Sequence, residues 1–183
     1  MRLLGLDPGL QRTGWGVIEA RHNLLRFLAA GVVVTDPEDD LALRLDALYR
    51  GLKEVVAGHA PALAAVEETV INRNAGSSLK LGQARGVVLL AAAHAGLAVT
   101  EYASKTVKRA VVGTGAADKR QVAMMVRTLL PASGQVSGDA ADALAVALCH
   151  AHHQAGQARL AAALASADAG GVPRRSPTSA DSC

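Results

Sequence analysis

The chain has 183 residues, half of them hydrophobic, with a formal net charge of +3 and two cysteines. This length supports one domain with a substantial core and is short for two. Two cysteines, at positions 149 and 183, do not make a disulfide framework, and no stretch reaches the ~20 apolar residues of a membrane helix. With no signal-peptide cleavage region near Met1, we expect a soluble cytoplasmic protein, whose weak positive charge permits nucleic-acid binding without requiring it.

The first part of the chain reads as three strands. Residues 2–7 form a short apolar run that stops at Pro8-Gly9, and residues 13–20 and 24–35 form two further strands. Because the connections between them are short, we expect an antiparallel meander.

A helix and a fourth strand follow. Asp36 and Pro37 are suitable as the cap and first residue of a helix whose apolar residues recur at helical spacing, and Gly58 is suitable as its end. The apolar run at 62–67 lacks alternation, which predicts a strand buried on both faces.

The second half of the chain is predicted to be mainly helical. The expected elements are a helix over about 78–94, a strand over 97–102, and helices over about 119–130 and 138–153, the last with Ser137 as its cap. Gly82 and Gly86 leave one face of the first of these helices bare, which permits close approach of the sheet or of a second subunit, and this helix is our candidate for the dimer contact. We interpret His150, His152 and His153 as residues at the end of the last helix and not as metal ligands.

These elements predict an α/β fold, a five-stranded mixed sheet with helices on both faces. Residues 1–155 would form this domain. Residues 156–183 are rich in Ala, Gly, Ser and Pro and are predicted to be a disordered tail, because they have too few large apolar groups to order themselves.

Four acidic residues interrupt or follow apolar runs. Asp7 ends the first strand and Glu67 ends the fourth, while Asp139 and Asp142 lie three apart on the last helix and so share a face. Strands one and four would be parallel neighbours, which places Asp7 and Glu67 side by side at the edge where such folds bind ligands.

Four converging carboxylates would repel one another, and a divalent cation removes that repulsion. Carboxylate oxygens suit Mg²⁺ and Mn²⁺, and two such ions about 4 Å apart can activate a water and stabilise the leaving oxygen of a phosphodiester. Singly, the acids have structural explanations: a turn at Asp7, a loop at Glu67, a helix dipole at Asp139. Their joint placement favours a metal-dependent nuclease.

Several motifs resemble the RuvC family of bacterial Holliday-junction resolvases. The resemblance runs from residue 1 to about 153 and rests on DPG-x-x-x-TG at 7–14, Glu67, LKLGQARG at 79–86, VVGTG at 111–115, MVRTLLP at 125–131 and DAADALA at 139–145. It implies a ribonuclease-H-like fold, a homodimer, and symmetric nicks in two like strands of a four-way junction that leave 5′ phosphates, in homologous recombination and DNA repair. It also implies that Asp7, Glu67, Asp139 and Asp142 are the metal-binding catalytic set and that a RuvA–RuvB branch-migration complex is a partner.

The resemblance further implies DNA contacts. Lys108 and Lys119 fall where the family carries basic residues important for junction DNA, and Lys105, Arg109 and Arg120 would extend that patch toward backbone phosphates. The alternative for all five is a solvated helix face.

A departure from the family concerns the loop after Glu67. Val70 stands where the family usually has an aromatic residue, so Val70 and Ile71 would act as an aliphatic wedge that stacks on bases less well than an aromatic ring. Asn72, Arg73 and Asn74 are expected polar contacts to DNA in the same loop.

Two other classes of function remain open at this point. A non-catalytic junction-binding protein would need no carboxylate cluster. A small actin-like phosphotransferase would need a second, duplicated domain to close over a nucleotide, and 183 residues leave no room for it.

Overall fold

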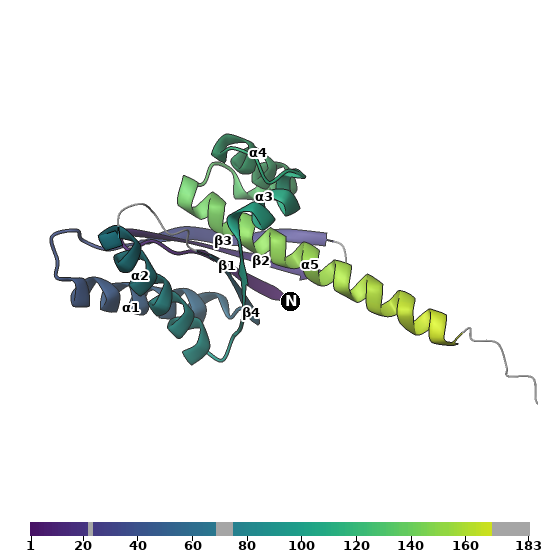
Figure 1. The fold of residues 1–183 in the computed structure, drawn as a ribbon, viewed down its shortest axis with the longest axis horizontal. Coiled ribbons are helices and arrows are strands. Elements are labelled where there is room, and N and C mark those ends of the chain that lie inside the picture. The colour runs from purple at the N-terminus through teal and green to yellow at the C-terminus, as the bar shows by residue number, and fades with distance from the viewer. Residues whose placement is uncertain (22–23, 69–74, 170–183) are drawn as a thin grey trace, which may run out of the picture.

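The protein folds around a five-stranded sheet, seen here in a computed structural model that describes residues 1–21, 24–68 and 75–169 (Figure 1). In chain order the elements are β1 (Arg2–Asp7), β2 (Arg12–Arg21), β3 (Leu24–Val34), α1 (Leu41–His59), β4 (Leu63–Glu67), α2 (Ala75–His94), β5 (Ala98–Tyr102), α3 (Ser104–Val112), α4 (Lys119–Leu129), a 3-10 turn (Pro131–Ser133) and α5 (Gly138–Ala169). Within these ranges, none of the helices combines the length and the hydrophobicity of a membrane-spanning segment.

The sheet is mixed, with strand order β3-β2-β1-β4-β5. β1 to β3 form the expected antiparallel meander, and β4 lies parallel to β1 and to β5. Leu6 of β1 is in register with Val66 of β4, so the next residues, Asp7 and Glu67, end neighbouring strands at one edge. The predicted parallel pairing of strands one and four is confirmed.

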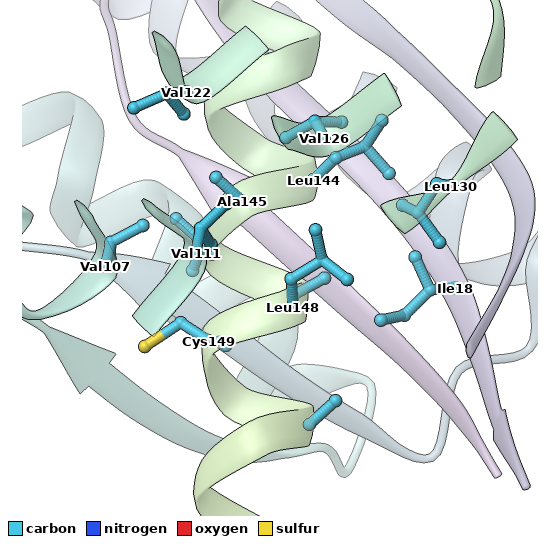
Figure 2. Close-up of a cluster of buried hydrophobic side chains, with 14 of the residues drawn as sticks. Ile18, Val107, Val111, Val122, Val126, Leu130, Leu144, Ala145, Leu148 and Cys149 are labelled. Carbon is cyan, nitrogen blue, oxygen red and sulfur yellow. The ribbon is translucent and has the colours of Figure 1, made fainter. Parts of the chain in front are cut away.

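Helices cover both faces of the sheet, as predicted (Figure 1). Because successive side chains of a strand point to opposite faces, Leu3 of β1 packs in the core under α3, α4 and α5, while Leu4 and Leu6 pack under α1 and α2. α5 is the central helix of its layer. In Figure 2 its Leu144 and Leu148 lie between Ile18 of the sheet and the apolar side chains of α4.

A row of glycines lets α5 approach the sheet closely. A Cβ at Gly5 would overlap the Ala143 carbonyl oxygen, one at Gly14 would overlap that of Asp139, and one at Gly16 would come within 2.7 Å of the Leu144 side chain. α5 therefore packs against bare backbone of β1 and β2. This close packing sets the distance between the first turn of α5 and the end of β1.

Several elements differ from the sequence predictions; α2, for example, begins at Ala75 and not at about 78. α1 begins at Leu41 and not at Pro37, because the Asp36 carboxylate accepts a hydrogen bond from the Glu38 amide (2.9 Å) and closes a turn. The same helix runs one residue past Gly58. The short helix α3 was not predicted as a separate element.

The predicted disordered tail from residue 156 is wrong for residues 156–169, which continue α5; residues 170–183 lie outside the described ranges. As a result, the histidines are not at a helix end. His150 is buried, and its Nδ1 lies 2.9 Å from the Tyr102 hydroxyl.

Candidate active site

The turn after β1 holds Asp7 in place. The Thr13 hydroxyl donates to the Gly9 carbonyl (2.6 Å) and accepts from the Gly9 amide (3.2 Å), and Thr13 is fully buried. Asp7 is in register with Gly14 across the β1–β2 pair. The DPG-x-x-x-TG motif is thus a hydrogen-bonded turn that presents one carboxylate at the edge of the sheet.

Three of the four predicted acids line one pocket of about 160 Å³. Asp7 and Glu67 reach it from the ends of β1 and β4, and Asp142 from the second turn of α5. The other lining residues are Ser104, Val107, Lys108, Lys119, Val122 and Ala145. Two lysines therefore face three carboxylates.

Asp139 stands beside this pocket and is held by a different cation. Its Oδ2 accepts from Arg12 Nε at 2.7 Å, and Lys119 Nζ lies 3.3 Å from Asp142 Oδ2. In the present side-chain arrangement, no three of the described acids, histidines or cysteines enclose a position for a metal ion. Asp139 is nevertheless close enough that its charge acts on Asp7.

The electrostatics of the site centre on Asp7. Burial, followed by the charges of Glu67 and Asp142, raises the pKa of Asp7 from its ordinary 3.8 to about 7, against the opposing effect of Lys119. Burial also raises the pKa of Glu67, which the hydrogen bond from Ser104 and the charge of Lys108 oppose. The charge of Asp142 raises the pKa of Lys119. The carboxylates thus carry more negative charge than the two lysines neutralise.

This donor set fits a hard divalent cation. The site offers carboxylate oxygens on three separate elements, partly buried, and an excess of negative charge that opposes ionisation of Asp7. Mg²⁺ and Mn²⁺ prefer such ligands, and a bound cation would lower the cost of ionising Asp7.

Of the five basic residues predicted to bind DNA, two line the pocket and three lie outside it. Lys108 and Lys119 line the pocket, while Lys105 and Arg109 are exposed on α3 outside it. Arg120 lines a neighbouring groove. Val70, Ile71, Asn72, Arg73 and Asn74 lie outside the described residues.

Two polar residues of the site were missed by sequence reasoning. Ser104 is a hydrogen-bond partner of Glu67, and Arg12 is the partner of Asp139. Neither belongs to a sequence pattern that identifies it, since Arg12 and Asp139 are 127 residues apart.

The mixed sheet, the acids at the ends of its two central parallel strands and the acids on the helix that crosses them define the class: a ribonuclease-H-like nuclease. A family profile described as crossover junction endodeoxyribonuclease RuvC matches residues 3–150. The chain belongs to the RuvC family, whose nucleases are metal-dependent.

Sequence relatives agree with this assignment. The chain is 60% identical to the crossover junction endodeoxyribonuclease RuvC of Acidiphilium cryptum over 162 residues, which are 88% of this chain and 97% of the relative. It is 58% identical to the RuvC of Paramagnetospirillum magneticum, with 90% and 99% covered.

Solved structures show the same fold. RuvC of Thermus thermophilus in complex with a Holliday junction substrate matches with a TM-score of 0.77 at 36% identity, over 86% of this chain and 96% of that one. The yeast mitochondrial Holliday junction resolvase Ydc2 matches with a TM-score of 0.62 at 10% identity, over 88% and 85%, and shows the fold alone.

Proposed function

We propose that this endonuclease of the RuvC family resolves four-way DNA junctions by cutting two strands of like polarity, with Asp7, Glu67, Asp139 and Asp142 as its catalytic, metal-binding carboxylates. The observation that carries the proposal is the convergence of Asp7, Glu67 and Asp142 from β1, β4 and α5 in one pocket, with Asp139 alongside.

Two Mg²⁺ ions per site are the cofactors that we propose, with Mn²⁺ as a substitute. When bound, such ions supply an activated water and charge stabilisation for the leaving 3′ oxygen, and the product carries a 5′ phosphate. The division of the acids supports two ions: Asp7, Glu67 and Asp142 line the pocket, and Asp139 stands to one side.

The remaining residues of the pocket have separable tasks. Ser104 orients the Glu67 carboxylate by donating a hydrogen bond to it. Lys119, whose side chain is 83% exposed, would be free to leave Asp142 for a phosphate of the DNA if Asp142 held a metal ion. Lys108, on the facing helix α3, contributes a second positive charge to the same phosphodiester.

The dimer contact that we propose is the exposed face of α2. A methyl group at Gly82 or Gly86 would have no neighbouring atom within 4 Å, and Leu79 and Leu90, at helical spacing on either side of these glycines, are 66% and 47% exposed. A two-fold dimer built on this apolar stripe would present two sites to a two-fold junction. A RuvA–RuvB complex as partner rests on family membership.

The test is cleavage of a mobile four-way junction and of a linear duplex of the same sequence, with Mg²⁺ and with Mn²⁺. We expect paired nicks in the junction, no cutting of the duplex, and loss of cutting in Asp7→Asn. Equal cutting of both substrates would contradict junction specificity, and wild-type rates in Asp7→Asn would contradict the metal site.

The dimer has its own test, because Gly86→Arg places a charge in the stripe without touching the pocket. Light scattering should give the mass of a dimer for the wild type and of a monomer for Gly86→Arg. A variant that stays dimeric would exclude this face of α2.

A further inference from the structure

A second concave surface lies beside the catalytic pocket, between α4 and the segment that leads into α5. It has a volume of about 400 Å³ and is lined by Arg120, Ala123, Arg127, Gln135, Val136 and Ala141. Among the described residues, the polar side chains that line it are two guanidinium groups and an amide, and none of the lining residues is an acid. The chemistry of this groove therefore suits an anionic ligand that accepts several hydrogen bonds.

The two arginines are spaced along one face of α4. Arg120 and Arg127 are seven residues apart, which is two helical turns, or about 10 Å along the axis. Both are exposed, and neither forms an ion pair with a described residue. By contrast, Arg12 and Arg85 each contact a carboxylate.

The acid that precedes α4, Asp118, forms the N-cap of the helix. The Asp118 carboxylate accepts from the Gln121 amide at 2.9 Å and caps the helix, while the Gln121 side chain accepts from the Asp118 amide. Because neither Arg120 nor Arg127 forms an ion pair with a described residue, their charges are available to a ligand from outside the chain.

The groove and the pocket are lined by consecutive residues of α4 and of α5. Lys119 and Asp142 line the pocket, and their immediate chain neighbours Arg120 and Ala141 line the groove. A polymer of phosphates whose scissile bond lies at Asp7 is therefore long enough to reach the groove from the pocket. A ligand unconnected with the pocket has no comparable reason to bind next to it.

We propose that this groove binds the sugar-phosphate backbone of the DNA strand that flanks the cleaved bond, with Arg120 and Arg127 on phosphates and Gln135 as an additional donor. The assignment rests on the proposed function and adds Arg127 and Gln135 to its DNA contacts. Contacts of this kind position the strand and carry no sequence information.

The experiment measures junction affinity and its dependence on salt in the non-cleaving Asp7→Asn background. Arg120→Ala and Arg127→Ala are compared with Arg26→Ala. Arg26 is an exposed arginine of β3, at the end of the sheet opposite Asp7, so its replacement removes the same charge far from both surfaces.

We expect each groove variant to weaken junction binding about tenfold and to lower the slope of log K against log salt by about 1, while Arg26→Ala changes neither. In the cutting-competent protein, the position of the nicks should stay the same. Affinities and slopes equal to those of Arg26→Ala would overturn the assignment, and so would a changed cleavage sequence, because it would indicate base contacts.

Failure of the groove and failure of the proposed function give different results. If the wild type neither binds nor cuts four-way junctions, the proposed function is wrong. If the wild type does both and the two arginine variants match Arg26→Ala, only the groove assignment is wrong. Tighter binding of an acidic peptide than of DNA in the groove would reassign it to a protein partner.

Discussion

Gly14 of β2 lies directly against the backbone carbonyl of Asp139 in the first turn of α5. Gly14 is also in register with Asp7 on the neighbouring strand. One position without a side chain therefore sets how closely a carboxylate of the sheet and a carboxylate of the helix approach. The same contact explains why α5 brings Asp142 into the pocket that β1 and β4 begin.

Replacing Gly14 with Ala should displace the first turn of α5. The added methyl would overlap the carbonyl oxygen and crowd the Asp139 side chain, so we expect junction cleavage to fall at least 100-fold, as misplacement by about 1 Å does in other enzymes. Unfolding should become easier by about 1–3 kcal/mol. Single-turnover cleavage and thermal denaturation measure the two effects.

Gly58→Ala is the matched control, because no atom lies within 4 Å of a methyl group there and Gly58 is inside α1. It should keep full activity and gain roughly 0.5–1 kcal/mol of stability. Normal cleavage by Gly14→Ala would mean that α5 adjusts its position without cost to the site.

The buried carboxylate of Asp7 should destabilise the folded, metal-free protein at neutral pH. Its pKa is raised to about 7 in the folded state, so between pH 3.8 and 7 the unfolded chain loses a proton that the folded chain retains, and stability falls as the pH rises. Asp7→Asn removes this penalty. At pH 8 in EDTA we expect the variant to be more stable by on the order of 2–4 kcal/mol, and at pH 3.5 to be equal.

Magnesium provides the internal control for that comparison. Added Mg²⁺ should raise the Tm of the wild type at pH 8 and leave that of Asp7→Asn nearly unchanged, because ligand binding to the folded state stabilises it. If Asp7→Asn is less stable than the wild type in EDTA at pH 8, the prediction that the ionised Asp7 carboxylate destabilises the folded protein is wrong.

The placement of Asp7 and Glu67 could be predicted from sequence because each ends an apolar strand, and the chain order of the strands predicts that β1 and β4 are neighbours. Arg12 and Ser104 could not, because a salt bridge or hydrogen bond to a distant carboxylate leaves no periodic pattern. They become visible only when Asp139 and Glu67 are in place.

The C-terminal part of α5 shows a different reason for failure. Residues 156–169 contain few large apolar groups, which suggested disorder, but seven of these fourteen residues are alanine. Alanine has the highest intrinsic helix propensity, so a helix already nucleated and packed upstream extends through them at little cost. Because the helix continues, His150 lies inside it, buried against Tyr102.

Thr13 should be sensitive to loss of its hydroxyl but not of its methyl group. Thr13→Val leaves the part-buried amide and carbonyl of Gly9 without the Thr13 hydroxyl, and we expect a loss of about 1–3 kcal/mol in the free energy of unfolding together with reduced cleavage. Thr13→Ser keeps both hydrogen bonds and should retain most of the activity. Urea denaturation of both variants checks this, and equal stability of the two variants would show that the turn does not depend on these hydrogen bonds.

Arg12 should act as an internal competitor of the metal. Its Nε lies 2.7 Å from Asp139 Oδ2, so a cation that uses Asp139 must displace the guanidinium or share the carboxylate with it. Arg12→Ala is therefore expected to bind Mn²⁺ several-fold more tightly in calorimetry, Arg12→Lys to stay near the wild type, and Asp139→Asn to bind more weakly. The ion pair is exposed enough that Arg12→Ala should change stability by less than about 1 kcal/mol.

Two outcomes would contradict this prediction. If Arg12→Ala leaves the Mn²⁺ affinity unchanged while Asp139→Asn lowers it, Arg12 does not compete with the metal for Asp139. If neither variant changes the Mn²⁺ affinity, Asp139 is not a metal ligand.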